Sequence, residues 1–374
     1  MSETPADIVL IGGGHSHVAV LADWARRGLP ARRAVLVTPD PKLRYSGMVP
    51  GWISGEHTCE EGLVDLAGLA RAAGVEIILD RCLAIDPEAR SILTLESGVL
   101  SFTNASIDVG GVGQAARILG DDPRLIDVRP IDAFVDRIDT ELAQRADGPL
   151  RIAIIGGGAA GFELAFALRN AAVSREAPQV TLVTGSTGPL PGHRRNAARK
   201  ALEEARRQSI TVIEGDADLS SGQLMVEGKV HEPQDQIIAA IGSGAPDWPR
   251  MGGLEVDMEG FIAVDAHQCA IGYPHIFAAG DCARRVDQQV AHSGVHAVHT
   301  GPVLAANLRA VLTGKPPRQS YRPRRASFYL ISTGNGEAIA SYGPLALQGR
   351  WVAWLKAWID KRWIASYARW SGGA

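Results

Sequence analysis

The feature that most constrains the fold is a pattern that occurs twice: an aliphatic run that ends in glycines and leads into a helical pattern. The two runs are IVLIGGG at 8–14 and IAIIGGG at 152–158, and their first glycines, Gly12 and Gly156, lie 144 positions apart. A strand, a glycine turn and a helix in this order place a pyrophosphate at the N-terminus of the helix. Two copies predict two nucleotides in one molecule, which is typical of a flavin that is reduced by a nicotinamide.

Length and composition fit a globular protein of two or three domains. The 374 residues are 46% hydrophobic and 21% charged, with a net charge of −3, as is ordinary for such proteins. No stretch approaches the ~18 apolar residues of a membrane-spanning helix, and the N-terminus lacks the features of a signal peptide. The four cysteines form no CxxC or CxxxxC pair, so we expect a reducing, cytoplasmic location. We also predict no nucleic-acid partner.

The C-terminal part is basic and rich in tryptophan. Residues 315–374 hold ten Lys or Arg but only two acids, a charge of +8, which leaves −11 on the rest of the chain. In a helical projection, five tryptophans share one broad arc with Val352, Leu355 and Ile359. Such an arc with flanking basic residues predicts an amphipathic helix at a membrane surface; docking on the protein's own core or on a homodimer partner is the alternative. The five are Trp351, Trp354, Trp358, Trp363 and Trp370.

Alternating strand and helix patterns predict an α/β fold with two Rossmann-like units. From about residue 247 the chain returns to the first unit through a strand at 261–265 and a helix at about 293–312. Gly314, followed by two prolines, ends that helix. The predicted parts are a discontinuous first domain at 1–120 and 247–315, a second domain at 121–246, and a C-terminal section with an amphipathic helix at 316–374.

The first fingerprint departs from the pattern G-x-G-x-x-G. Gly12 and Gly14 fit, but His17 stands at the third glycine, which normally lets the helix pack closely on the strand. We expect the side chains at this helix start to contact the pyrophosphate or the flavin. For the two histidines, donation to phosphate is the simpler interpretation, and proton transfer is the alternative because histidine titrates near neutral pH. The expected contacts are His15, Ser16 and His17.

The second fingerprint is complete, because it has all three glycines: Gly156, Gly158 and Gly161. Glu163 follows on the helix. It either stabilises the helix dipole, by ~0.3–1 kcal/mol, or faces the nicotinamide or flavin ring and directs hydride or proton transfer. The acid that usually bonds the adenosine ribose is missing in both units, where Thr38 and Thr184 stand instead. The choice between NADH and NADPH therefore stays open.

These motifs resemble those of the pyridine nucleotide–disulfide oxidoreductase superfamily: two fingerprints, IIAAIGS at 237–243 and HIFAAGDCA at 275–283. The resemblance implies a glutathione-reductase-like fold, with FAD in the first domain and NAD(P)H in the second. A finer resemblance is to type II NADH dehydrogenases and to the flavoprotein module fused to selenophosphate synthetases. It is carried by GGGHSHVAVL, YSGMVPGWISG, GVHAVHTGPVLAANL and GRWVAWLKAWIDKRW.

The resemblance also assigns site residues. Gly280 and Asp281 match the motif that holds the ribityl chain of FAD. Arg44 and Tyr45 fall near the isoalloxazine, where Tyr45 stacks, donates a hydrogen bond or is a core aromatic. The helix near residue 293 is expected to aim its amides at the flavin's pyrimidine ring, where positive dipole character stabilises reduced flavin. The further residues assigned to cofactor binding are Gly242, Ser293, Gly294 and Val295.

The superfamily's CxxxxC pair is absent, since 42–55 contains no cysteine. Electrons are therefore expected to pass from the flavin directly to an acceptor. His292, His296 and His299 share one face of the predicted helix; we interpret them as the lining of a flavin or quinone pocket and predict no metal. The alternative for these histidines is a metal site, since i, i+4 pairs chelate zinc.

The sequence therefore predicts a FAD-dependent NAD(P)H dehydrogenase with a quinone or similar small acceptor, peripheral on the inner face of the membrane. The candidate catalytic residues are Glu163, Tyr45 and His17. Two alternatives stay open: a soluble reductase for a selenium, sulfur or protein acceptor, and a non-enzymatic flavin redox sensor.

Overall fold

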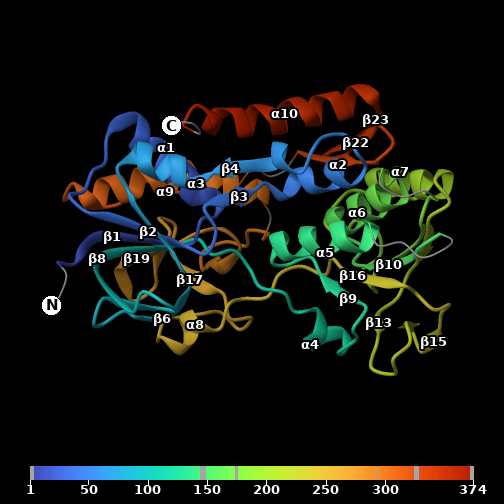
Figure 1. Ribbon diagram of the computed structural model, residues 1–374, viewed down its shortest axis with the longest axis horizontal. Helices are drawn as coiled ribbons and strands as arrows, with labels where there is room; N and C mark the ends of the chain where they lie inside the picture. The colour runs from blue at the N-terminus through green and yellow to red at the C-terminus, as the bar shows by residue number, and fades with distance from the viewer. Residues whose placement is uncertain (1–3, 144–148, 173–175, 293, 324–327, 371–374) are drawn as a thin grey trace.

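The computed structural model describes residues 4–143, 149–172, 176–292, 294–323 and 328–370. Two units that each combine a sheet with helices lie side by side, and one long helix, α10 (Arg350–Ala368), runs above the junction between them (Figure 1). Both main sheets contain parallel strands, so the predicted α/β fold class is confirmed.

The first unit is built on a ten-stranded sheet to which two distant stretches of the chain, 6–107 and 262–285, contribute. β1 pairs with β2 and β8 in parallel, and β5 and β19 extend the parallel run on the two sides. Side chains on both faces of β1 are buried, as expected of a parallel strand covered on both sides. These strands are β1 (Ala6–Ile11), β2 (Ala34–Thr38), β5 (Glu76–Leu79), β8 (Val99–Ile107) and β19 (Tyr273–Ala278).

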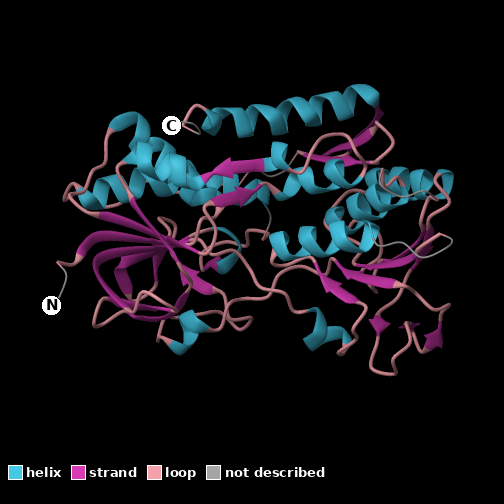
Figure 2. Cartoon of the chain, in the orientation of Figure 1, coloured by secondary structure: helices cyan, strands magenta, loops and turns pink. Residues whose placement is uncertain are grey.

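Three helices cover one face of this sheet, visible above its strands in Figure 2. α1 packs against both α9 and α3. Its Trp24 is fully buried in a cluster with residues of β1 and β2, which fixes the helix on the sheet. The helices are α1 (His15–Arg27), α3 (Leu66–Ala73) and α9 (Gly294–Leu312).

The second unit has a five-stranded parallel sheet in the order β12-β11-β10-β16-β9. Phe162 and Phe166 of α6 lie in the core of this unit and are fully buried. The strands are β9 (Leu125–Asp127), β10 (Arg151–Ile155), β11 (Gln179–Val183), β12 (Thr211–Ile213) and β16 (Gln236–Ala239), and the helices are α5 (Ile131–Ala143), α6 (Ala159–Arg169) and α7 (Arg195–Arg207).

The C-terminal section joins the two units. Its antiparallel sheet packs on α6 and α7 of the second unit, whereas Trp363 of α10 and Trp370, just beyond the helix, pack on the core of the first unit. No helix in the described residues is long and apolar enough to cross a membrane. The strands are β21 (Tyr329–Ser332), β22 (Ala338–Tyr342) and β23 (Leu345–Gly349).

The structure corrects two details of the sequence analysis. α9 begins at Gly294, so His292 precedes the helix and does not share a helical face with His296 and His299. The five tryptophans of the C-terminal section do not share one face either, and Trp370 lies beyond the end of α10. Three of them are exposed, and Trp363 and Trp370 are partly buried against the first unit. The broad arc seen in projection wraps around the helix far enough to meet both solvent and protein.

Candidate active site

Both glycine turns end a central strand and open a helix that has no side-chain cap. Gly14 and Gly158 are the N-cap residues of α1 and α6, and neither helix has an acid in its first turn. A Cβ at Gly161 would collide with the carbonyl oxygen of Gly156, whereas a Cβ at Gly158 would meet nothing within 4 Å. The second glycine turn is therefore packed tightly where Gly161 meets Gly156 and open at Gly158, as the close approach of a nucleotide pyrophosphate requires.

The first turn uses His17 in place of the missing glycine. The His17 ring is fully buried, with Nδ1 2.6 Å from the Gly12 carbonyl oxygen and Nε2 2.8 Å from Ser106 Oγ. Burial lowers the pKa of His17 to about 4, although the Gly12 carbonyl opposes the shift. Both ring nitrogens are engaged below the turn. This arrangement favours a packing role over the catalytic role considered from the sequence.

The residues around the first turn fit FAD. Asp281, on the 3₁₀ turn Gly280–Cys282, is buried and receives a hydrogen bond from Arg129 Nη2 at 3.0 Å. His15 has a buried Nε2 without a hydrogen-bond partner, and burial together with Arg129 lowers the pKa of its ring to about 4. A neutral histidine with an unused nitrogen, an arginine and a glycine turn provide donors that an anionic cofactor requires.

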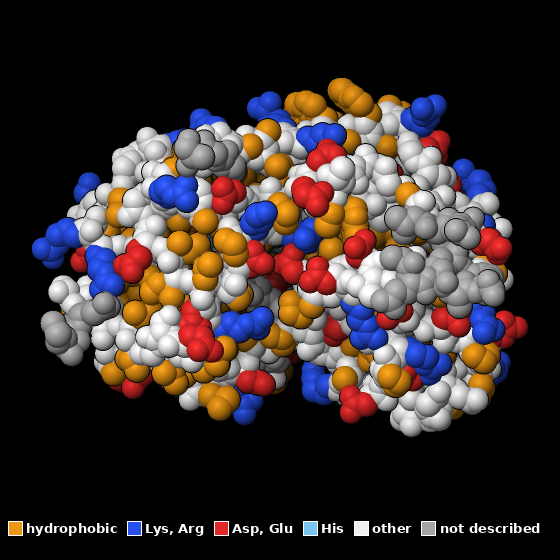
Figure 3. All heavy atoms as spheres, in the orientation of Figure 1, with side chains coloured by type: hydrophobic (Ala, Val, Ile, Leu, Met, Phe, Trp, Pro, Cys, Tyr) orange, Lys and Arg blue, Asp and Glu red, His pale blue; other side chains and the backbone are white. Residues whose placement is uncertain are grey.

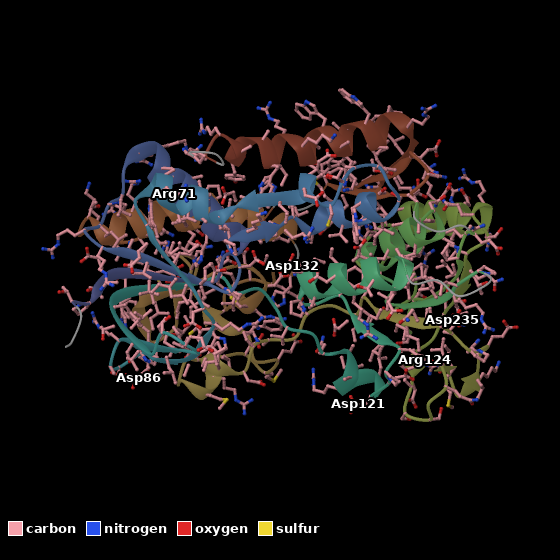
Figure 4. All side chains as sticks on the ribbon, viewed as in Figure 1. Arg71, Asp86, Asp121, Arg124, Asp132 and Asp235 are labelled. Atoms are coloured by element: carbon pink, nitrogen blue, oxygen red, sulfur yellow. The ribbon has the colours of Figure 1, made fainter. Side chains whose placement is uncertain are left out.

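Arg44 connects the two units. Its Nε donates to Asp132 Oδ1 on α5 at 2.7 Å, and its Nη1 donates to the Cys59 carbonyl oxygen at 3.1 Å. Figure 4 shows Asp132 in the middle of the molecule, where α5 faces the first unit. Tyr45, the next residue, stacks on Trp363 with ring centroids 4.5 Å apart. Both predicted residues therefore lie at the junction, and Tyr45 makes the stacking contact with α10.

A buried charge network links the second fingerprint to α10. Lys356 Nζ lies 4.0 Å from Glu163 Oε1 and 2.8 Å from Asp360 Oδ2, and it donates to the Gly47 carbonyl oxygen at 2.8 Å. The Tyr45 hydroxyl donates to Asp360 Oδ1 at 3.2 Å. Glu163 also accepts from the Ser332 N–H at 3.0 Å. The network thus joins α6, the segment after β3 (Lys42–Arg44) and the C-terminal section.

Burial sets the proton affinities of this network. It raises the pKa of Glu163, and the Lys356 ammonium opposes that shift. Burial alone would lower the pKa of Lys356, but Glu163 and Asp360 raise it above its ordinary value. Burial and Asp360 also raise the pKa of Tyr45. Lys356 is therefore a cation at neutral pH, and Glu163 binds a proton more readily than an exposed glutamate.

One pocket lies between α10 and the segment after β3, and its lining includes Gly47, Glu56, His57, Lys356 and Asp360. We call it the α10 pocket.

A second pocket is lined by Asp281, His292, His296 and Tyr321, among others. The ring of His296 lies 2.6 Å from the Tyr321 hydroxyl. No group of residues suited to hold a metal ion occurs in the described chain.

The remaining predicted residues lie at the carboxyl edge of the two sheets or at the start of α9. Thr38 ends β2, is buried and donates to the Asp40 carbonyl oxygen at 3.2 Å. Gly242 follows β16 with a φ of +88°. Gly294 and Val295 open α9. Ser293 lies outside the described residues.

Sequence reasoning missed four residues of this region: Asp108, Arg129, Lys356 and Asp360. Asp108 directly follows β8, and Arg129 comes two residues after β9. The carboxyl ends of parallel strands are where α/β sheets bind ligands, so strand position was the available signal. Lys356 and Asp360 are spaced i, i+4, a pairing signal that the tryptophan pattern obscured.

Comparison with protein families identifies one match that covers most of the chain. Residues 6–301 match the family described as pyridine nucleotide-disulphide oxidoreductase.

Two curated proteins are similar to the chain over more than two thirds of both lengths. Ferroptosis suppressor protein 1 of Taeniopygia guttata is 24% identical over 276 residues, 69% of this chain and 69% of that protein. The nitric oxide reductase FlRd-NAD(+) reductase of Aeromonas salmonicida is 27% identical over 297 residues, 74% and 71% of the two chains.

Solved structures share the fold at low sequence identity. The sulfide:quinone oxidoreductase of Aquifex aeolicus has a TM-score of 0.78 at 18% identity and covers 98% of this chain and 92% of its own. The water-forming NADH oxidase of Lactobacillus brevis bound to NADH has a TM-score of 0.72 at 18% identity, with 90% and 75% covered.

Proposed function

Because the chain belongs to the pyridine nucleotide-disulphide oxidoreductase family, we propose that it is a FAD-dependent NAD(P)H dehydrogenase whose acceptor is a quinone. Proteins of this family bind FAD and NAD(P)H. FAD supplies the redox chemistry, because it takes a hydride equivalent from NAD(P)H and passes the electrons on. The first turn, with His15, Arg129 and Asp281, would hold FAD, and the second turn would hold the nicotinamide cofactor.

The α10 pocket carries the proposal for the acceptor. Met48 lines one side of it, and Ala353, Lys356 and Asp360 of α10 line the other. Glu163 Oε1 lies 4.0 Å from Lys356 Nζ. Reduction of a quinone by NAD(P)H needs one proton beyond the transferred hydride. Glu163, whose pKa is raised by burial, would hold that proton, and Lys356 would orient its carboxyl group.

The cysteines support direct transfer to the acceptor. All four are free, and the two buried ones, Cys269 and Cys282, have pKa values that burial raises to about 12. Thiols in that state are poor nucleophiles. Cys59 is also a free thiol, and burial raises its pKa.

The exposed face of α10 supports contact with a membrane surface, where quinones reside. Trp351, Trp354 and Trp358 are 54%, 69% and 48% exposed, and Arg362 lies 5.3 Å from the Trp358 ring. Apolar side chains project from the upper edge of the molecule in Figure 3, where Figure 1 shows α10. Aromatic side chains next to arginine suit the headgroup region of a bilayer, and the α10 pocket lies on the opposite side of the same helix.

The test is an anaerobic half-reaction experiment on the purified holoprotein. NADH or NADPH should bleach the visible flavin absorbance, and a water-soluble quinone should restore it. Gly161→Ala should retain FAD but lose bleaching, because the added Cβ collides with Gly156. If neither nucleotide bleaches the flavin, the dehydrogenase assignment is wrong. If a quinone fails to restore the absorbance but a sulfur, selenium or protein acceptor succeeds, only the quinone assignment is wrong.

A further inference from the structure

A buried carboxyl group lies at the N-terminus of α1, at the turn assigned to FAD. Asp108 is 2% exposed. Its Oδ2 accepts hydrogen bonds from the N–H groups of Ser16 at 2.7 Å and His17 at 2.9 Å, and its carbonyl oxygen accepts from the Gly14 N–H at 3.1 Å. Asp108 therefore occupies two of the N–H groups that the first turn of a helix offers to an anion.

The charges around Asp108 do not balance a second anion. Asp281 is the acid that interacts with it electrostatically, and Asp281 itself pairs with Arg129. His15 and His17 are neutral near pH 7, because burial lowers the pKa of each to about 4. The thiol of Cys282 is neutral as well, since burial raises its pKa to about 12. Among the described residues in these contacts, Arg129 is the one cation, and it pairs with Asp281.

FAD adds a pyrophosphate with two negative charges to this turn. Like charges that share a low-dielectric site favour the neutral form of a carboxyl group. We propose that FAD binds to this chain together with one proton, which the carboxylate of Asp108 takes up. The acid form keeps a carbonyl oxygen that can accept from Ser16 and His17, and the turn loses one negative charge.

The proton affinity of Asp108 places this exchange near neutral pH. Burial raises the pKa of Asp108 to about 7, against the N–H groups of His17 and Ser16, which lower it. The pyrophosphate raises this pKa further in the complex. FAD affinity should therefore be constant below the pKa that Asp108 has in the FAD-free protein. Above that pKa the affinity should fall by about tenfold per pH unit. This inference rests on FAD as cofactor and does not depend on the acceptor.

The test measures binding rather than turnover. The full-length protein is freed of FAD and titrated with FAD between about pH 6 and about pH 9 by quenching of flavin fluorescence. Calorimetry at about pH 8 in two buffers of different ionisation enthalpy counts the protons taken up. We expect close to one proton per FAD for the wild-type protein, together with the tenfold-per-unit fall in affinity.

Asp108→Asn should remove both signals, because the amide keeps an acceptor oxygen but cannot titrate. A matched control is Asp80→Asn. Asp80 is also buried, but its carboxylate accepts from the N–H groups of Glu96 and Ser97 rather than from the start of α1. This variant should keep the wild-type proton count. An unchanged slope in a folded Asp108→Asn variant would overturn the proposal. Binding without proton uptake by the wild-type protein would overturn it as well, even if Asp108→Asn does not fold.

Discussion

Lys356 holds together charges from three parts of the chain, and its side chain is 15% exposed. Removal of one partner of a buried charge group leaves the others unpaired. We expect Lys356→Met to lower the free energy of unfolding by about 3–5 kcal/mol, because Glu163 and Asp360 would lose their shared cation. Chemical denaturation of the holoprotein measures this change. The control is Lys361→Met on the same helix, whose side chain is 58% exposed and pairs with Glu61 at 3.3 Å; it should cost at most about 1 kcal/mol. Equal losses in both variants would mean that Lys356 is not a buried cation.

Glu163 is the residue to which the proposed mechanism assigns the additional proton. Glu163→Gln keeps the size of the side chain and an acceptor for the Ser332 N–H, but it cannot donate a carboxyl proton. Reoxidation of the flavin by quinone should slow by about 100-fold, in the range of general acid catalysis. Reduction by NAD(P)H should change far less, because hydride transfer needs no such proton. Stopped-flow absorbance separates the two half-reactions, with Glu61→Gln, on the exposed pair with Lys361, as the control. An unchanged rate of reoxidation would remove Glu163 from the proton path.

At the scale of elements, the two fingerprint units were predictable because their signals are local. The strand predicted at 261–265 spans Ile262–Val264, and the helix predicted at 293–312 begins one residue later. A run of aliphatic residues before glycines leaves few alternatives to a strand and a turn. Asp108 and Arg129 carry no such motif, because their role depends on which strand ends meet in space.

For helix α10, the sequence did not predict which side chains face solvent and which face the protein. Its tryptophans suggested one apolar face, but Trp363 stacks on Tyr45 while Trp354 faces solvent. Tryptophan suits a protein core and a membrane interface equally well, so the pattern could not separate them. The buried pair Lys356 and Asp360 lies between apolar positions of the helix and was therefore not expected to face inward.

The exposed tryptophans of α10 give a prediction that belongs to this element. Replacement of Trp351, Trp354 and Trp358 by serine should reduce binding to vesicles that contain anionic lipid by at least about tenfold. Each replacement removes apolar surface that would otherwise contact the lipid. The melting temperature should stay nearly constant because these side chains are exposed. Vesicle co-sedimentation measures the binding. The control is the double variant Met251→Ser and Met258→Ser, whose side chains are 83% and 105% exposed and lie outside the C-terminal section. Equal loss in both variants would indicate non-specific adsorption.

At the scale of the molecule, several contacts hold the two units in one arrangement, among them Arg44 with Asp132, Arg129 with Asp281, and α10 across the junction. The cofactor turns belong to different sheets, and the network of Glu163, Lys356 and Tyr45 lies where the units meet. The site thus depends on docking of the units as much as on either fingerprint. This dependence explains why the motifs identified the cofactors, whereas the proposed acceptor pocket could not be derived from them.

The distribution of charge adds a prediction for the whole molecule. The last 60 residues carry +8 and the remainder carries −11, so an anionic bilayer attracts the C-terminal section and repels the body. The protein should therefore bind in one orientation, with α10 towards the lipid and both glycine turns towards water. Salt screens this attraction over a distance of about 10 Å at 0.1 M. Binding to anionic vesicles should therefore weaken strongly between low and high salt. Binding to neutral vesicles should be weaker and nearly independent of salt.

Brominated lipids test the orientation, because they should quench the tryptophan fluorescence of the bound wild-type protein. This quenching should disappear when Trp351, Trp354 and Trp358 are replaced. Binding that is equal on neutral and anionic vesicles would show that apolar contact alone orients the protein.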